Sequence, residues 1–177
     1  MGTSQQLHQY LFPDDEINVF AVLDGASVPD LLAQLHEHQP DHVCLYRGEL
    51  EPGLAETAPY LIQLKPNFEF SNWLIENGQG KHWGIFAQSY ADLRTLRRHF
   101  RSFLTVHDEG GRPLLFRYYD PRVMRKYLPT CNAKELALVF GSVESYLVED
   151  EDADSMLRFT RDARKLRQEK KLLFDKE

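Results

Sequence analysis

The sequence lacks the features that mark a membrane protein, a secreted protein or a general nucleic-acid-binding protein. Its 177 residues contain no apolar run long enough to cross a bilayer. Residues 1–9 are polar and do not show the charged-then-apolar pattern of a signal peptide. The net charge is −6, whereas broadly acting nucleic-acid-binding proteins are usually basic. We therefore expect a cytoplasmic protein with no membrane partner, and the charge disfavours nucleic acid as a partner.

Cysteines and metal-binding patterns are also scarce. The chain has two cysteines, Cys44 and Cys131, which lie far apart and in no metal or redox spacing, so both are expected to be reduced thiols. His38 and His42 stand at helical spacing, but Pro40 interrupts the helix between them, and no acidic or thiol ligand stands at matching spacing. The sequence therefore predicts no metal site and no cofactor.

Motifs of nucleophilic catalysis and phosphate binding are missing as well. The chain has no Gly-x-Ser-x-Gly elbow, no P-loop and no dinucleotide-binding fingerprint. We therefore expect no enzymatic activity. The alternative is a small hydrolase or transferase of the α/β class that uses Asp24, Asp120 and a histidine such as His82. These side chains would then have to converge in one concave pocket.

The first part of the chain alternates strand and helix patterns. Residues 17–23 are apolar and β-rich, and they end at the turn dipeptide Asp24-Gly25. A helix pattern follows, which Pro40 ends before a short apolar strand at residues 42–46. Strand, helix and strand over about thirty residues indicate a βαβ unit with a pair of parallel strands.

Further strands and helices follow along the chain. The expected strands lie at residues 58–64, 83–87 and 143–148, the last as an edge strand or extended segment, and a hairpin turn lies at residues 108–112. Helical patterns separate most of these segments. Residues 1–148 are therefore expected to form one α/β domain, with a mixed, partly parallel sheet flanked by helices.

The C-terminal segment, residues 149–177, is predicted to be a helical appendage of this domain. Residues 149–154 are acidic and are expected to act as a hinge, followed by a basic helix from about Ser155 to Phe174. A narrow apolar seam repeats along that helix at spacings of three and four residues, flanked by basic side chains. Such a seam either packs on the domain or docks an acidic partner helix, so Arg164 and Arg167 are candidate partner-binding residues.

An arginine-rich helix is expected before the hairpin. Its apolar stripe faces the core, and its other faces carry Arg94, Arg97, Arg98 and Arg101. Such a pattern is more often a solvated face, with the arginine stems lying over apolar neighbours, than a nucleic-acid contact. An RNA-binding domain that uses this helix is a third hypothesis, which the acidic net charge disfavours.

An aromatic strand at residues 116–119 runs into the helix start Asp120-Pro121-Arg122. The carboxylate of Asp120 is expected to cap that helix, and proline suits its first position. Alternation along the strand would place Arg117 and Tyr119 on one face. Because guanidinium groups suit carboxylates and carbonyls, we interpret Arg117, Tyr119, Asp120 and Arg122 as a candidate partner-binding patch. An internal ion pair of Arg122 is the alternative.

Several segments, taken in order, resemble one family, the domain of unknown function 4123 proteins, which act as adaptors (effector chaperones) in type VI secretion. The similar segments are Val19–Ala26, Ala58–Leu64, Trp83-Gly84 followed by Ser89, Leu93–Val106 and Phe116–Val123. The last resembles the Phe-x-Tyr/Phe-Asp-Pro-Arg-Val signature of that family, and the first looks like its first strand, which typically ends in Asp-Gly-Ala. The resemblance covers about residues 17–148.

The resemblance implies a function that the residue patterns alone do not. Such proteins bind a toxic effector protein and help load it onto the VgrG spike protein of the type VI secretion apparatus. They are implied to be adaptors rather than enzymes and to need no cofactor. Many relatives have a longer C-terminal helical lobe, whereas only one basic helix is expected here after the acidic hinge.

Overall fold

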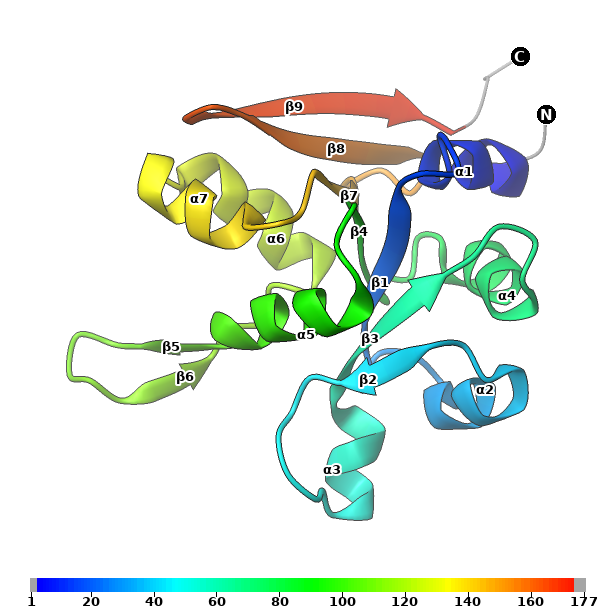
Figure 1. The fold of residues 1–177 in the computed structure, drawn as a ribbon, viewed down its shortest axis with the longest axis horizontal. Coiled ribbons are helices and arrows are strands. Elements are labelled where there is room, and N and C mark those ends of the chain that lie inside the picture. Colours follow the sequence, from blue (N-terminus) through cyan, green and yellow to red (C-terminus); the bar gives the residue numbers. More distant parts are fainter. Residues whose placement is uncertain (1–2, 174–177) are drawn as a thin grey trace.

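A seven-stranded antiparallel sheet forms the centre of the molecule in the computed structural model, which describes residues 3–173 (Figure 1). Its strand order is β2-β3-β1-β4-β7-β8-β9. The strands are β1 (Asn18–Asp24), β2 (His42–Cys44), β3 (Pro59–Leu64), β4 (Gly84–Ser89), β7 (Ser145–Glu149), β8 (Ser155–Asp162) and β9 (Lys165–Leu172). A separate hairpin of β5 (Thr105–His107) and β6 (Pro113–Leu115) projects from the body of the molecule.

Helices cover both faces of the large sheet (Figure 1). The helices are α1 (Thr3–Leu11), α2 (Leu31–His38), α3 (Pro52–Thr57), α4 (Glu69–Gly78), α5 (Leu93–Ser102), α6 (Pro121–Tyr127) and α7 (Ala133–Phe140), and a 3₁₀ turn, η1 (Leu128–Thr130), follows α6. α1, α2 and α4 pack on one face, and α5, α6 and α7 on the other. The protein is therefore a three-layer α/β domain with helices outside and the sheet between them.

Alternation along β1 divides the core into these two layers. Phe20 and Val22 point into the cluster beneath α5, α6 and α7, whereas Val19, Ala21 and Leu23 point into the cluster beneath α1, α2 and α4. All five side chains are buried, because β1 lies in the interior of the sheet and is covered on both faces. β1 is thus fixed on every side, and its last residue, Asp24, has a fixed position.

The prediction of a partly parallel sheet is wrong, because every strand pair that the structure describes is antiparallel. β1 and β2 do run in the same direction, as the expected βαβ unit requires. However, β3 lies between them and pairs antiparallel with both. The sequence pattern identified the strands correctly but did not indicate that a strand from farther along the chain separates them.

The predicted C-terminal helix is also wrong, because residues 155–172 form the β8–β9 hairpin. Leu157 and Phe159 are buried in the core at a spacing of two, as a strand that packs one face on the core requires. Ala163 turns the chain with a positive φ of 51°. β8 pairs with β7, so β7 is an interior strand rather than an edge strand. The division after residue 148 stays a prediction, although the sheet continues across it.

The expected cap of α6 is confirmed, and α5 and α7 also begin with side-chain caps. Asp92 accepts a hydrogen bond from the amide of Thr95, and Asp120 accepts one from the amide of Arg122. Asn132 starts α7 with a full capping box. Among residues 3–173, no helix combines the length and the apolar character needed to cross a membrane.

Candidate partner-binding site

The turn after β1 holds a buried carboxylate. The Asp24 side chain is only 3% exposed. It accepts hydrogen bonds from the amide of Ala26 at 3.1 Å and from the hydroxyl of Ser27 at 2.9 Å. A buried carboxylate is costly unless it is hydrogen-bonded and paired with a positive charge. The buried Asp24 carboxylate therefore needs a positively charged partner, which a distant segment of the chain supplies.

That cation is Arg117, which lies 93 residues farther along the chain. Its Nη2 atom lies 2.5 Å from Oδ2 of Asp24. The hydrogen bond with Asp24 raises the pKa of the Arg117 guanidinium, although partial burial acts in the opposite direction. The Arg117 side chain remains 47% exposed. Arg117 is thus fixed at one end by a buried partner and keeps N–H donors at the surface.

Alternation along the strand predicted that Arg117 and Tyr119 share one face. In the structure, Tyr119 does not lie on the exposed face of Arg117. β6 ends at Leu115 and residues 117–120 form a turn, so the spacing of two no longer applies. Tyr118 and Tyr119 are both buried, and Tyr118 donates a hydrogen bond to the carbonyl of Phe100 at 2.9 Å. Burial raises the pKa of Tyr119 far above its ordinary value. The Arg117 guanidinium lies 6.0 Å from the centre of the Tyr119 ring, at a distance where a cation–π interaction helps to hold Arg117 in place.

Asp120 repeats this arrangement with the next arginine. Its carboxylate caps α6 and accepts two hydrogen bonds from Arg122, at 3.0 Å from Nε and 2.7 Å from Nη2. Burial raises the pKa of the Asp120 carboxyl, but the hydrogen bonds from Arg122 outweigh burial and hold the pKa below its ordinary value. Asp120 is 9% exposed and Arg122 is 55% exposed. The internal ion pair considered for Arg122 therefore forms.

We call this group of side chains the Asp–Arg node, which consists of Asp24, Arg117, Asp120 and Arg122. Its two carboxylates lie inward, and its two guanidinium groups reach the surface. The node has no net charge, yet it presents N–H donors outward in fixed positions. Such an arrangement suits carboxylate or carbonyl oxygens of another molecule.

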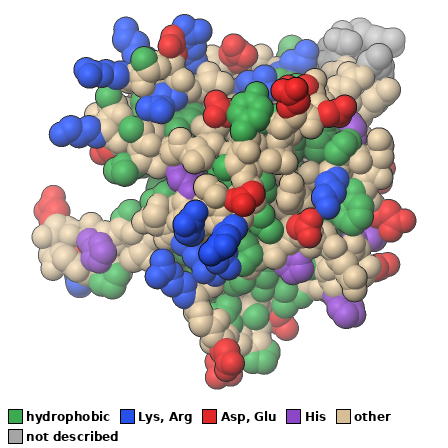
Figure 2. Space-filling view, viewed as in Figure 1, with side chains coloured by type: hydrophobic (Ala, Val, Ile, Leu, Met, Phe, Trp, Pro, Cys, Tyr) green, Lys and Arg blue, Asp and Glu red, His purple; other side chains and the backbone are tan. Residues whose placement is uncertain are grey.

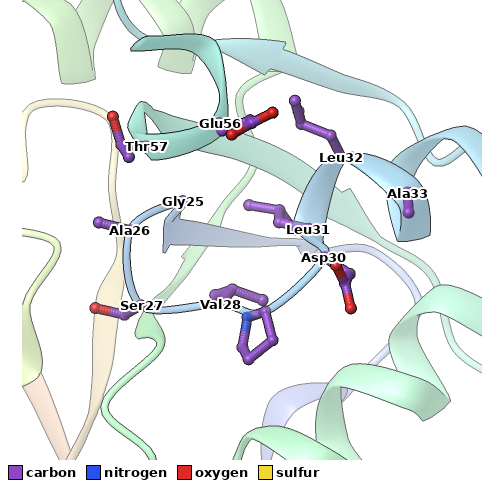
Figure 3. A pocket seen from close by; sticks show the side chains of 11 residues that line it. Gly25, Ala26, Ser27, Val28, Asp30, Leu31, Leu32, Ala33, Glu56 and Thr57 are labelled. Carbon is purple, nitrogen blue, oxygen red and sulfur yellow. The ribbon is translucent and has the colours of Figure 1, made fainter. Parts of the chain in front are cut away.

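A surface groove of about 550 Å³ begins beside the node (Figure 3). The loop Gly25–Val28 faces Glu56 and Thr57, which belong to the end of α3. Gly25 donates a hydrogen bond to the carbonyl of Ala58 at 3.0 Å. A Cβ atom at Gly25 would lie 2.5 Å from the carbonyl oxygens of both Glu56 and Ala58. This position therefore admits only glycine without a shift of the backbone.

The other two predicted partner-binding residues, Arg164 and Arg167, lie elsewhere. Strand pairing across the sheet puts Arg167 in the same row as Val19, whereas Asp24 lies at the other end of β1. Arg167 pairs with Asp162 on the hairpin, and both side chains are exposed. The structure therefore separates the six predicted residues into two surfaces.

Sequence reasoning missed the contact of His82 with the nearly buried carboxylate of Glu149. Nδ1 of His82 lies 2.9 Å from Oε2 of Glu149, and the amides of Gly80 and His82 each donate to that carboxylate at 3.0 Å. Burial raises the pKa of Glu149. The sequence pattern predicts Glu149 as part of the acidic hinge. Its position directly after the apolar strand at residues 143–148 is the signal that could have indicated a buried side chain.

The three residues of the hydrolase or transferase alternative are engaged separately. Asp24 pairs with Arg117, Asp120 pairs with Arg122, and His82 lies against Glu149. The groove beside the node is lined by the loop after Asp24 and by the end of α3 rather than by these three side chains. Within residues 3–173, no three His, Cys, Asp or Glu side chains are grouped so that they could hold a metal ion.

Fold and site together define a three-layer α/β protein with an antiparallel sheet and a charged node that joins two distant segments. The family model for the domain of unknown function DUF4123 matches residues 19–138, well over half of the chain. The chain belongs to the DUF4123 family. Among curated proteins and solved structures, none matches.

Proposed function

We propose that this protein is a cytoplasmic adaptor that binds a toxic effector protein and helps load it onto the VgrG spike of a type VI secretion system. The proposal rests on membership of the DUF4123 family and on the role that the sequence resemblance implies. The chain acts by binding both partners in a defined orientation and catalyses no reaction.

The observation that carries the proposal is the convergence of two segments that resemble the family. The Asp-Gly-Ala turn after β1 and the signature segment at residues 116–123 meet in the Asp–Arg node. Their exposed atoms are guanidinium N–H donors rather than a nucleophile or a free base. Donors of this kind bind carboxylates and carbonyls, which are abundant on the surface of a protein partner.

Preorganisation makes the node suited to binding. A free arginine side chain loses rotamer freedom when a partner orders it, at a cost of about 0.5–1.5 kcal/mol. Arg117 and Arg122 are already held by carboxylates that are nearly inaccessible to solvent. Part of this ordering cost is therefore met during folding, before a partner arrives.

The electrostatics of the node disfavour the hydrolase or transferase alternative. A general base is most effective when its pKa lies near the working pH. The Asp120 carboxyl instead has a lowered pKa, and the Asp24 carboxylate accepts hydrogen bonds from a guanidinium, a hydroxyl and an amide. Asp120 is thereby stabilised as an ion, and the Asp24 carboxylate is occupied by three donors, so both suit an electrostatic support better than proton transfer.

The test compares lysine substitutions in the node with lysine substitutions on the hairpin. Arg117→Lys with Arg122→Lys keeps each positive charge above its carboxylate but removes the planar fork. Arg164→Lys with Arg167→Lys is the matched control at the other end of the sheet. In the native host, we expect the node variant to recover at least about tenfold less effector with the tagged protein, while the control stays close to wild type.

A second arm of the same experiment measures the effector found on the purified VgrG spike with and without this protein. We expect deletion of the gene to remove the effector from the spike. An unchanged amount of effector on the spike after deletion would show that the proposed function is wrong. Unchanged effector recovery by the folded node variant would reject the node as the binding surface but leave the adaptor role intact.

A further inference from the structure

Helix α5 carries an uncompensated basic surface that the Asp–Arg node does not use. Its ten residues include Arg94, Arg97, Arg98 and Arg101 and no acidic side chain. Within residues 3–173, none of these four guanidinium groups forms an ion pair. Figure 2 shows basic side chains gathered over α5, with hydrophobic side chains exposed between this patch and α3. On a chain of net charge −6, this patch is a local exception.

Arg101 fixes α5 to the segment that follows β2. Its Nη2 atom donates to the carbonyls of Cys44 at 2.7 Å and Tyr46 at 3.1 Å, and its Nε atom donates to the carbonyl of Leu45 at 3.1 Å. Burial lowers the pKa of Arg101, and the nearby charges of Arg97 and Arg47 lower it further. The helix and this segment thus form the two walls of one rigid surface.

Two neighbouring hollows lie along these walls and form what we call the α5 furrow. The first, of about 500 Å³, is lined by His42 and Val43 on one side, by Arg94 and Arg97 on the other, and by the two acids Asp41 and Asp92. The second, of about 560 Å³, is apolar with a basic rim. Its lining includes Leu45, Leu50, Leu54, Leu104, Leu115 and the two arginines Arg47 and Arg101.

Two acids line the first hollow. Asp92 caps α5 by accepting a hydrogen bond from the amide of Thr95, and Asp41 pairs with Lys65 at 2.9 Å. Four arginines line the two hollows against these two acids, so the furrow keeps a net positive charge. Leu54 and Leu115 are both exposed although they are large and apolar. A surface that combines exposed leucines with unpaired arginines has the composition of a protein-binding site.

We propose that the α5 furrow binds an acidic amphipathic helix of the effector protein. Acidic side chains of that helix pair with the arginines, and its apolar side chains cover the leucines. α5 is about 15 Å long at 1.5 Å per residue, so a partner helix of about three turns spans it. The inference deepens the proposed function and rests on it. Five leucines and a single aromatic residue, Tyr46, line the apolar hollow, and this predominance of leucine favours a protein partner over nucleic acid.

The direct test uses a fluorescent helical peptide built of glutamate and leucine, with a second peptide that has lysine in place of glutamate. Binding to the full chain is measured by fluorescence polarisation at rising salt. We expect the acidic peptide alone to bind, and salt to weaken it. Arg94→Glu with Arg97→Glu should weaken binding by about tenfold or more, because charge reversal at these two lining residues opposes the acidic face. Lys134→Glu with Lys171→Glu introduces the same charge change outside the furrow and should leave binding within about twofold.

A separate variant tests the apolar half of the furrow. Leu115→Ser changes an exposed side chain and leaves the arginines in place. We expect it to weaken peptide binding without a change in the salt dependence. Thermal unfolding of each variant checks that the fold is intact.

Wild-type protein that does not bind the acidic peptide, or equal weakening by the two charge-reversed pairs, would overturn the proposal. Tighter binding of a 20-nucleotide oligouridine, with displacement of the peptide, would overturn it in favour of nucleic acid.

Capture of the effector from the native host separates this inference from the proposed function. We expect wild-type protein to retain the effector and Arg94→Glu with Arg97→Glu to lose it. Retention by both proteins would reject the furrow and leave the adaptor role standing. If the wild-type protein captures no effector at all, both the furrow and the adaptor role would be rejected.

Discussion

The Asp–Arg node and the β8–β9 hairpin each carry two of the arginines predicted to bind a partner, but they hold them differently. In the node, Arg117 and Arg122 pair with carboxylates that are 3% and 9% exposed. On the hairpin, Arg167 pairs with Asp162, which is 57% exposed. A buried carboxylate that loses its cation leaves an unpaired charge in the interior, whereas an exposed one returns to water. Sequence alone predicted both pairs of arginines as partner-binding, and burial of the acid is what distinguishes them.

The largest effect is expected where Arg117 is replaced by alanine. Asp24 would then be buried without its cation, and breaking such a pair costs about 3 kcal/mol even after allowance for the exposure of the arginine. Urea unfolding should show this loss in the free energy of unfolding. Asp24→Asn with Arg117→Ala removes the charge as well and should recover part of the stability. If Arg117→Ala alone is as stable as wild type, the node does not hold the two segments together.

Local sequence patterns predicted much of the fold but not how distant segments pair. The apolar runs at residues 17–23, 58–64 and 83–87 became strands because burial on both faces of a sheet requires continuous apolar side chains. The cap Asp120 was recognisable because a cap depends on neighbours in the sequence. These features depend on short-range contacts, so the chain specifies them locally.

The wrong predictions about the sheet, the C-terminal segment and the partner of Arg117 concern contacts between distant segments. The place of β3 between β1 and β2 depends on a strand that comes later in the chain. The hairpin was taken for a helix because Met156, Phe159, Ala163 and Leu166 repeat at helical spacing, while Leu157 and Phe159 fit a strand equally well. Only pairing with β7 decides between the two periods. Likewise, nothing near Arg117 in the sequence indicates that Asp24 is its partner.

An intermediate effect is expected from Asp120→Asn, measured as a function of pH. Asparagine caps a helix about as well as aspartate, so the variant isolates the charge paired with Arg122. The folded-state pKa of Asp120 lies below its ordinary value near 3.8. The ion pair therefore stabilises the fold above that value, and its contribution disappears as the pH falls through the lower, folded-state pKa. We expect wild type to exceed the variant by about 1 kcal/mol at pH 7 and to lose this advantage below pH 3.8.

Asp162→Asn on the hairpin is the control for this pH series. Its pair with Arg167 is exposed on both sides, so solvent replaces most of the interaction. A constant difference between Asp120→Asn and wild type from pH 7 to pH 3 would contradict the assignment of the stability to the ionised carboxylate.

The smallest effect is expected from Arg167→Ala on the hairpin. Its guanidinium is 67% exposed, and exposed ion pairs typically contribute less than about 1 kcal/mol. β9 is held mainly by its backbone pairing with β8, which this substitution leaves intact. We therefore expect a change in the free energy of unfolding below about 0.5 kcal/mol, measured beside Arg117→Ala under the same conditions. A loss as large as that of Arg117→Ala would mean that an exposed pair stabilises this fold as strongly as a buried one, and the distinction between the two surfaces would fail.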